Sequence, residues 1–520
     1  MLPLDVKIVG SYALCKKLRC FQMNVDRICL LLLFVTASVL NTRDADAAER
    51  PNIVVVLIDD LRYDVFGYMN HPFVETPHID ALAAGGMRFD SAFVTTSLCS
   101  PARASFLTGQ YMHHHKVVSN ADLMPQGTVT FAQLLQKAGY DTAFVGKWHM
   151  GGSSDAPRPG FDHWVSFRGQ GSYFPNGQKL NVDGQLKTQQ NYMTDELTEY
   201  ATRWLAGRDP STPFLLYLSH KGVHGLYDPA PRHRDRYKHQ KFTPPASMTN
   251  SPANGAGKPM WVRDQRNSWH GVEFPYHGRS GQTLAEMYLH YCEMILSIDD
   301  SVGRLMTTLG EIGADRNTLV LFTSDGGHLW GEHGLIDKRC AYEESIRIPL
   351  LAHWPETIAP ASRCDAVVTN IDVAPTLLEL AGVAIPEQMD GHSFRPLLSD
   401  PNTDTSRNTL LYEYYWEPAF PQTPTTFALR DSRYKLIQYH GIWDTDELYD
   451  LKTDPQETHN LIHEPDQQAR VNRMRRELHE RLQESGGLAI PLGFKRNHGS
   501  SLRSPSGTKR ASFPEHMISP

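Results

Sequence analysis

The sequence predicts an α/β fold in which helices flank a large, mainly parallel central sheet, followed by a small C-terminal antiparallel sheet with one helix. Two observations support this prediction. Strand-like apolar runs alternate with amphipathic segments along most of the chain, as in βαβ units. After about residue 402 strand-like segments follow one another directly. With 520 residues and 40% hydrophobic side chains, the chain is able to bury a large core.

The first 48 residues have the pattern of an export signal. Basic residues precede an apolar run over residues 28–40, and the small residues Ala45, Ala47 and Ala48 follow it. That run is shorter than a comfortable membrane span, and no later segment is apolar enough for one. We therefore predict a signal peptide over residues 1–48 and an exported protein, periplasmic or secreted; an uncleaved anchor is the alternative.

Five segments of the body have the apolar, β-branched character of buried strands. They are "NIVVVLIDD", "DTAFVG", "PFLLYLS", "NTLVLFTSD" and "IPLLAHW". Helices are indicated by "TPHIDALAAGG", where Thr76 is the expected cap, by "FAQLLQKAGY" and by the long "LAEMYLHYCEMILSIDDSVGRLMTTLG". Residues 225–281 have little periodicity and are predicted to form a surface excursion.

The C-terminal part has a different character. "FALRDSRYKLIQYH" and "DELYDL" predict a small antiparallel sheet, and "DQQARVNRMRRELHERLQES" predicts an exposed helix. The polar, basic end is expected to be disordered. We therefore divide the chain after its signal peptide into a main domain over residues 49–401, an α+β subdomain over 402–491 and a tail over 492–520.

Charge and cysteine content restrict the function. The formal net charge of −7 argues against a general nucleic-acid binder, which is usually basic. The body keeps Cys99, Cys292, Cys340 and Cys364, too few for a disulfide framework in a domain of this size. A single pair between Cys340 and Cys364 is the one disulfide considered.

Charged residues and histidines follow four of the predicted strands, at the sheet edge where open α/β sheets bind ligands. The carboxylates suit a hard cation such as Ca²⁺ or Mg²⁺. The run His113-His114-His115 is interpreted as structural or as the wall of a pocket. The residues that follow the four strands are Asp59 and Asp60; Lys147 and His149; His220, Lys221 and His224; and Asp325.

The segment "LCSPARASFLTG" places a thiol at the start of a predicted helix. Pro101 suits the first turn, so Cys99 lies at or just before the helix N-terminus, where free amides favour an anion. Arg103 lies one turn further on and is expected to reach back toward Cys99.

This segment resembles the signature of the type I sulfatases, within the alkaline-phosphatase-like superfamily. "GYDTAFVGKWH" resembles their second signature, and "PNIVVVLIDDLRYD" and "FTSDGGHLWGEHGLIDKR" also fit. The resemblance covers about residues 51–491. It implies an alkaline-phosphatase-like fold, and a catalytic sulfatase domain over residues 49–401.

In this family the motif cysteine, matched by Cys99, is oxidised to formylglycine. The resemblance therefore implies a partner enzyme, either a formylglycine-generating enzyme or an anaerobic sulfatase-maturating enzyme. One hydroxyl of the hydrated aldehyde attacks the sulfate sulfur and the alcohol leaves. The second hydroxyl then collapses to the aldehyde and expels sulfate, which a thiol or serine could not do.

The resemblance also implies a role for each matched residue. Asp59, Asp60, Asp325 and the modified Cys99 would bind the metal, Ca²⁺ with Mg²⁺ as the alternative. Arg103 would stabilise the diol, His149 would orient it, and Lys147 and Lys338 would hold sulfate oxygens. His224 is the candidate acid for the leaving alcohol, and His220 is the alternative.

One position departs from the family pattern. The Asn or His that usually follows the third metal aspartate is Gly326 here. Either water completes the coordination, or His328 takes the place of that ligand, or the metal binds more weakly.

The substrate class follows from further resemblance. "GQYMHHHKVVSN" and "GKWHMGG" resemble N-acetylglucosamine-6-sulfatases and mucin-desulfating enzymes, which implies a carbohydrate 6-O-sulfate. Trp164, Trp269 and Trp416 are candidates for stacking on a sugar, with ordinary packing as the alternative. There are two competing hypotheses: a phosphonate or phosphodiester hydrolase of the same superfamily, and a non-catalytic glycan-binding relative.

Overall fold

A computed structural model describes residues 50–273, 281–405, 407–441 and 443–489. The predicted signal peptide and C-terminal tail lie outside these residues, so export and a disordered tail stay predictions. Within the described residues, no helix is both long and apolar enough to cross a membrane.

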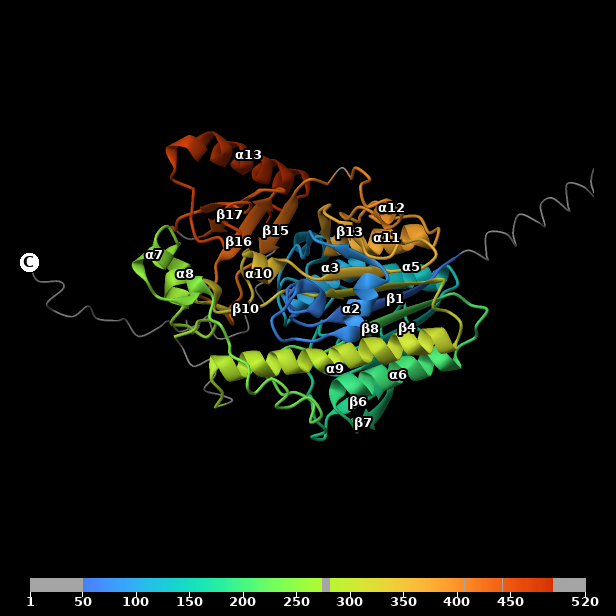
Figure 1. Cartoon of the computed structure of the whole chain (residues 1–520). Coiled ribbons are helices and arrows are strands. Elements are labelled where there is room, and N and C mark those ends of the chain that lie inside the picture. Colours follow the sequence, from blue (N-terminus) through green and yellow to red (C-terminus); the bar gives the residue numbers. More distant parts are fainter. Residues whose placement is uncertain (1–49, 274–280, 406, 442, 490–520) are drawn as a thin grey trace, which may run out of the picture.

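A ten-stranded sheet forms the centre of the molecule, in the order β13-β2-β12-β9-β1-β8-β4-β5-β6-β7 (Figure 1). Its central strands run parallel, which confirms the predicted α/β class: β9 (Thr318–Ser324), β1 (Asn52–Ile58), β8 (Phe214–Ser219), β4 (Asp141–Gly146) and β5 (His163–Ser166). Antiparallel pairs occur toward the edges, in β12 (Leu350–His353), which lies between β9 and β2 (Met87–Phe89), and in the hairpin of β6 (Lys179–Val182) and β7 (Gln185–Thr188). The edge strand β13 (Ser362–Cys364) is parallel to β2.

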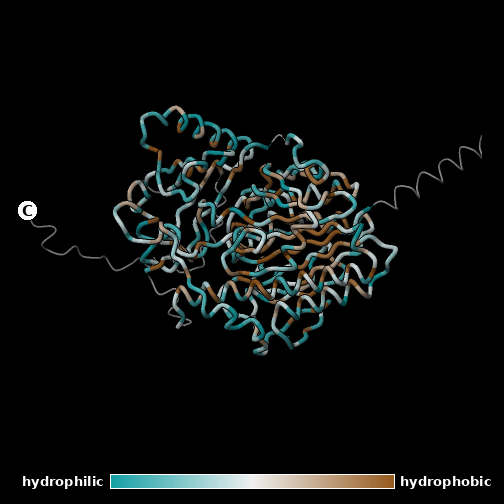
Figure 2. Tube along the Cα trace, in the orientation of Figure 1, coloured by the Kyte–Doolittle hydropathy of each residue, from teal (hydrophilic) through white to brown (hydrophobic). Residues whose placement is uncertain are grey.

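Helices cover both faces of the central strands, and the residues of β1, β8 and β9 are therefore buried on both sides of the sheet. One face packs against α2 (Pro77–Ala84), α6 (Met193–Gly207) and α9 (Leu284–Glu311). The other packs against α3 (Cys99–Thr108), α5 (Phe131–Lys137), α11 (Val373–Leu380) and α12 (Arg395–Ser399). The apolar strands therefore lie between two helical layers, as the brown centre of Figure 2 shows.

Local sequence signals account for the helix starts. Thr130 with Gln133, and Thr283 with Glu286, form capping boxes at the starts of α5 and α9. The predicted cap Thr76 does precede α2, but its hydroxyl donates to Asp80 Oδ1 at 2.8 Å and does not cap the helix amides.

Short elements connect the layers. They are η1 (Gly67–Met69), β3 (Ala92–Phe93), α4 (Met112–His115), η2 (Ala246–Met248), α7 (Pro252–Gly255), α8 (Met260–Gln265), β10 (Leu329–Trp330), η4 (Glu332–Gly334), β11 (Ile336–Asp337), α10 (Glu343–Ile346), β14 (Val368–Thr369), η5 (Asn370–Asp372) and η6 (Pro465–Gln467). The described part of the predicted surface excursion contains η2, α7 and α8. It is anchored through Trp261, which packs edge-on against Tyr439 with ring centroids 5.5 Å apart.

The predicted C-terminal sheet is present as four antiparallel strands: β15 (Leu410–Tyr414), β16 (Thr425–Arg430), β17 (Tyr434–His440) and β18 (Glu447–Asp450). The prediction that α13 (Gln468–Glu484) is an exposed helix is wrong for one of its faces. Val471, Met474, Leu478 and Leu482 are buried in a cluster with apolar residues of this sheet. Their spacing of three and four residues forms an apolar stripe that the many charges of the segment conceal.

Buried ion pairs join this C-terminal sheet to α10 of the main domain. Glu343 of α10 bonds Lys435 at 3.0 Å and Arg430 at 2.9 Å, and Lys435 also pairs with Glu457 at 2.7 Å.

The run of three histidines has a structural arrangement: His113 bonds Glu413 at 2.8 Å, His114 bonds Asp390, and His115 bonds Ser105.

The disulfide considered between Cys340 and Cys364 is absent, since both thiols are free. Cys340 lies in an apolar cluster with residues of the C-terminal sheet, whereas Cys364 lies on the edge strand β13 in a different cluster, with its Sγ 3.6 Å from the Pro401 carbonyl oxygen.

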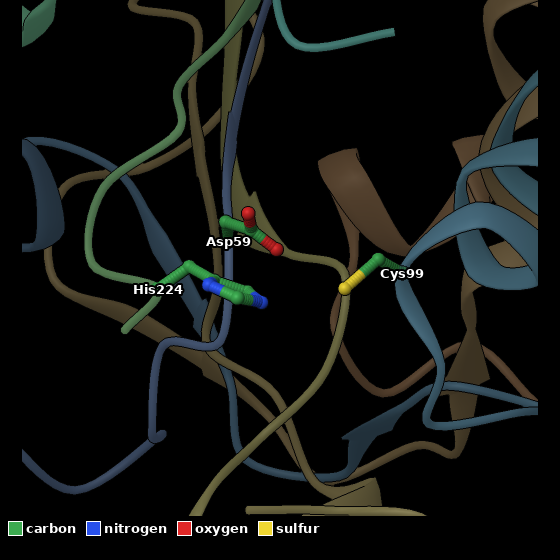
Figure 3. A group of neighbouring side chains, drawn as sticks. All are labelled: Asp59, Cys99 and His224. Carbon is green, nitrogen blue, oxygen red and sulfur yellow. The ribbon is translucent and has the colours of Figure 1, made fainter. Parts of the chain in front are cut away.

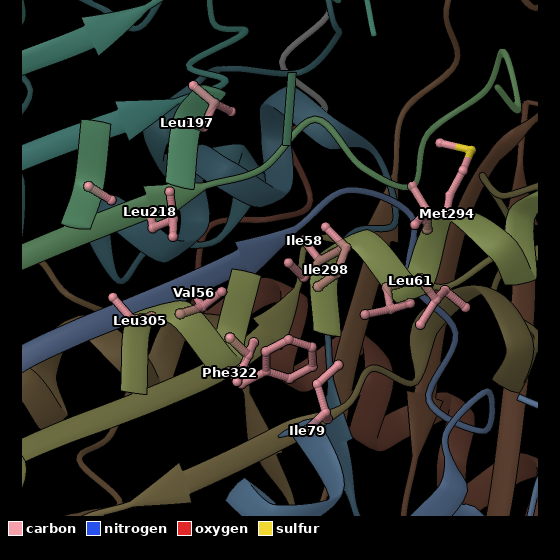
Figure 4. Packing of buried hydrophobic residues seen from close by; sticks show 14 of the residues in the cluster. Val56, Ile58, Leu61, Ile79, Leu197, Leu218, Met294, Ile298, Leu305 and Phe322 are labelled. Atoms are coloured by element: carbon pink, nitrogen blue, oxygen red, sulfur yellow. The ribbon is translucent and has the colours of Figure 1, made fainter. Parts of the chain in front are cut away.

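The fold predicts where stability resides. Phe322 of β9 is fully buried beneath α9 among Val56, Ile298 and Leu305 (Figure 4). Phe322→Ala should lower the free energy of unfolding by about 3–5 kcal/mol because it leaves a cavity. Denaturant unfolding followed by tryptophan fluorescence measures this. Leu186→Ala, on the exposed strand β7, is the control and should change it by less than about 0.5 kcal/mol. Equal effects of the two variants would contradict the assigned core.

Candidate active site

Three carboxylates meet at the carboxyl edge of the central sheet. Asp59 and Asp60 directly follow β1 and Asp325 directly follows β9, and the register of these strands pairs Ile58 with Ser324. One carboxylate oxygen of each residue lies within 4.8 Å of those of the other two. All three residues are buried, which confirms that parallel strands deliver them to one place.

Buried cations surround these carboxylates. Arg103 donates from Nε to Asp325 Oδ2 at 2.7 Å and places a second nitrogen 3.5 Å from Asp59 Oδ1. Lys147 donates to Asp59, and Lys338 donates to Asp60. Burial alone would raise the pKa of Asp59, but Lys147 and the other nearby cations hold that pKa well below its usual range. Burial and the neighbouring Asp59 raise the pKa of Asp325 to about 7.

This arrangement fits a divalent cation. The Asp59 Oδ1 atom is buried and accepts no hydrogen bond among the described residues. Carboxylates this close repel one another, and Asp59 adds to the effect of burial in raising the pKa of Asp325; a cation between them would relieve that repulsion. Carboxylate oxygen is also the ligand type of hard metal ions.

Cys99 is the first residue of α3, as predicted from Pro101. The Ser100 amide next to it donates to Asn120 Oδ1 at 3.0 Å. Figure 3 shows the Cys99 sulfur pointing toward Asp59 and His224, and the three side chains offer ligand atoms within 4.8 Å of one another. Burial raises the pKa of the Cys99 thiol, so the encoded side chain is not a ready thiolate nucleophile.

Arg103 does not reach back to Cys99 through a hydrogen bond as expected. Its guanidinium bonds Asp325, the Lys147 carbonyl at 2.7 Å and the Ser219 hydroxyl at 2.6 Å. These partners lie at the carboxyl ends of β9, β4 and β8, three strands of the central sheet. Arg103 thus ties the helix that carries Cys99 to the edge of the sheet.

The structure separates the two candidate acids. His224 lies in the site, with Nε2 3.8 Å from Asp60 Oδ2 and Nδ1 2.6 Å from the Gly225 carbonyl oxygen. His220 instead places Nε2 3.0 Å from the Ser301 hydroxyl of α9, within the helical layer. Burial lowers the pKa of His220 to about 3, and no charged group of the site contributes to that shift.

His149 lies beside Cys99, with Nδ1 3.1 Å from the Ser100 hydroxyl. Burial, together with Lys147, holds its pKa well below the ordinary value. The ring is therefore neutral and serves as a hydrogen-bonding group at the start of α3.

Two residues of the site have no assigned role in the sequence analysis. Gln170, in the loop after β5, accepts from Lys147 Nζ at 2.6 Å. Lys221 follows β8 and lies 4.0 Å from the ring of Tyr173. The position of Lys221 after a predicted strand could have indicated that it belongs to the site. The loop around Gln170 has no sequence feature that indicates this.

The tryptophans differ from one another. Trp164 is a core residue stacked on Phe144 with ring centroids 4.6 Å apart, so a sugar-stacking role for it is wrong. Trp269 and Trp416 are partly exposed, and the Trp416 indole donates to the Pro421 carbonyl at 3.2 Å.

Known proteins share this fold and sequence pattern. The family model described as Sulfatase matches residues 51–383, and one described as N-sulphoglucosamine sulphohydrolase, C-terminal, matches residues 331–485. The chain is 30% identical over 496 residues to N-acetylglucosamine-6-O-sulfatase of Bacteroides thetaiotaomicron, covering 85% of this chain and 88% of that one. It is 31% identical to human N-acetylglucosamine-6-sulfatase, covering 77% of this chain and 74% of that one.

A solved structure of a protein in complex with its substrate D-glucosamine-2-N,6-O-disulfate superposes with a TM-score of 0.78. It is 28% identical and covers 86% of this chain and all of that one. Because the family match spans more than half of the chain and includes the Cys99 segment, the chain belongs to the sulfatase family and is a sulfuric ester hydrolase.

Proposed function

We propose that this protein hydrolyses a carbohydrate 6-O-sulfate, such as that of N-acetylglucosamine-6-sulfate, through a formylglycine made from Cys99 and a bound Ca²⁺. The observation that carries the proposal is the position of Cys99, at the start of α3 and pointing at a buried carboxylate cluster ringed by cations. The two relatives named for N-acetylglucosamine-6-sulfate cleavage support the substrate.

Asp59, Asp60 and Asp325 would hold the ion, and their all-oxygen ligand set favours Ca²⁺, with Mg²⁺ as the alternative. When bound, the ion supplies positive charge against the oxygens of the reacting sulfate group.

The hydrated aldehyde at position 99 would supply both the attacking oxygen and the second hydroxyl that releases sulfate. Because the aldehyde forms only by oxidation of the cysteine, we propose that a formylglycine-generating or anaerobic maturating enzyme modifies Cys99. From the pattern of residues 1–48 we also propose that the protein is exported.

The surrounding residues bind and orient the reacting groups. Lys147 and Lys338 place their ammonium groups on the carboxylates beside Cys99, where both would also meet sulfate oxygens. Arg103, which bonds Asp325, holds α3 against the edge of the sheet and adds positive charge next to position 99. His149 fixes the start of α3 through Ser100.

His224 would protonate the leaving alcohol. Its Nδ1 donates to the Gly225 carbonyl and keeps its proton, so the proton given to the alcohol would be the second one of the imidazolium, on Nε2, the atom that faces Asp60. Without that proton the sugar would leave as an alkoxide, which is a poor leaving group.

The first prediction concerns Cys99. Cys99→Ala should fold normally and lose sulfate release from N-acetylglucosamine-6-sulfate, because alanine has no oxygen to attack sulfur. Cys364→Ala, another free buried cysteine, is the control and should stay active. Mass measurement of the peptide over residues 97–103 of active protein should show an aldehyde. An unmodified thiol in fully active protein, or faster cleavage of an aryl phosphonate than of an aryl sulfate, would contradict the proposal.

The second prediction concerns the metal. Asp325→Ala should weaken Ca²⁺ binding by at least about tenfold, because it removes a ligand and the anchor of Arg103. Calorimetric titration of metal-stripped protein and elemental analysis measure this. Asp209→Ala, an exposed carboxylate, should bind Ca²⁺ like the wild type. Full metal occupancy in Asp325→Ala would refute the ligand assignment.

The third prediction separates the two histidines. His224→Ala should lower kcat about 10²–10⁴-fold with a sugar sulfate and much less with 4-nitrophenyl sulfate, whose leaving group needs no proton. His220→Ala should affect thermal stability and show no dependence on the leaving group, because His220 bonds Ser301 of α9. The opposite pattern would assign the acid role to His220.

A further inference from the structure

Lys221 is a buried cation that lacks a partner. The described residues contain five buried lysines, and four of them have hydrogen bonds or ion pairs to oxygen atoms: Lys147, Lys258, Lys338 and Lys435. Lys221 is 3% exposed, and its ammonium makes no hydrogen bond or ion pair with any described residue. The ammonium instead lies over the face of the Tyr173 ring, 4.0 Å from the ring centroid.

The contrast with Lys258 shows what a structural buried lysine looks like here. Lys258 also lies over aromatic rings, at 4.3 and 4.7 Å from Tyr342 and Tyr449. Its ammonium, however, donates to the Tyr449 hydroxyl and to the Glu457 carbonyl, both at 2.7 Å, and reaches Glu447. Burying an ammonium without such partners costs free energy, so the unpartnered Lys221 is unfavourable for folding alone.

The surroundings of Lys221 are those of the reacting centre. Lys221 lies three residues before His224, and Tyr173, whose ring lies 4.0 Å from its ammonium, bonds the His224 carbonyl. Burial, together with the like charge of Lys147, lowers the pKa of Lys221 to about 7. An anion beside the ammonium would oppose both effects and favour the charged form.

Lys147 and Lys338 already have carboxylate partners, Asp59 and Asp60. Lys221 is the remaining ammonium at the site, and the Tyr173 ring holds it without neutralising it. Tyr173 is itself fixed, since its hydroxyl donates to the His224 carbonyl at 2.5 Å.

We propose that Lys221 is a third ammonium that binds the sulfate group of the substrate, beside Lys147 and Lys338. This inference rests on the proposed sulfate ester hydrolysis. Lys221 donates to a non-bridging sulfate oxygen, takes part in no covalent step, and stabilises the charge on the departing sulfate.

The test compares Lys221→Met and Lys221→Arg with the wild-type holoenzyme. In Lys221→Met, kcat/KM for N-acetylglucosamine-6-sulfate should fall about 10²-fold, and inhibition by inorganic sulfate should weaken in parallel. The melting temperature should stay the same or rise, because a costly buried charge is replaced by an apolar side chain of similar length. Lys221→Arg keeps the charge and should retain most of the affinity for sulfate.

Lys187→Met, an exposed lysine on β7, is the control for loss of one positive charge and should leave turnover and sulfate inhibition unchanged. Turnover and sulfate inhibition of Lys221→Met within about threefold of the wild type would overturn the inference. So would a large fall in the melting temperature of Lys221→Met with unchanged sulfate inhibition, because that combination marks a structural lysine. Failure of the wild type to release sulfate would instead overturn the proposed function.

Discussion

The rest of the site depends on the burial of three carboxylates at one edge of the sheet. Asp59, Asp60 and Asp325 are removed from water, and this costs free energy unless positive charge lies close by. Arg103 and two lysines supply part of that charge from separate segments. The carboxylates therefore fix the positions of the cations, and the cations in turn fix α3 and the loop that carries Lys338.

The C-terminal subdomain supports both of these segments. Ser97, two residues before Cys99, bonds the Tyr412 hydroxyl at 2.7 Å, and Tyr412 belongs to β15. Arg339, next to Lys338, bonds Glu417 at 3.1 Å, just beyond the same strand. One small sheet thus supports both the segment that carries Cys99, the proposed nucleophile, and the segment that carries Lys338, a proposed sulfate-binding residue. Ion pairs of Glu343 with Arg430 and Lys435 also hold the same sheet to α10.

Patterns that depend on neighbours in the chain were predictable, and those that depend on distant partners were not. The strands before Asp59 and Asp325 follow from their apolar runs, and the helix start at Cys99 follows from the position of Pro101. Burial of Trp164 depends on Phe144 and Phe161 around it. Likewise, the missing partner of Lys221 is visible only once every neighbouring side chain has its place. Sequence alone shows residue types at an edge, and the structure shows which charges are balanced.

Gly326 occupies the position at which the family usually has an Asn or His ligand, and the structure shows what surrounds it. Its backbone does not have the positive φ that favours glycine, and a Cβ there would make ordinary contacts, 3.7 Å from Lys338 Cδ. The backbone therefore does not require glycine at this ligand position. His328 lies close to this site. Its Nε2 bonds the Tyr227 hydroxyl at 3.0 Å, its buried Nδ1 has no hydrogen-bond partner among the described residues, and one ring nitrogen lies within 4.8 Å of carboxylate oxygens of Asp60 and Asp337. An ion held by the three aspartates would take a further ligand from position 99, and either water or His328 would take the place of the usual Asn or His side chain.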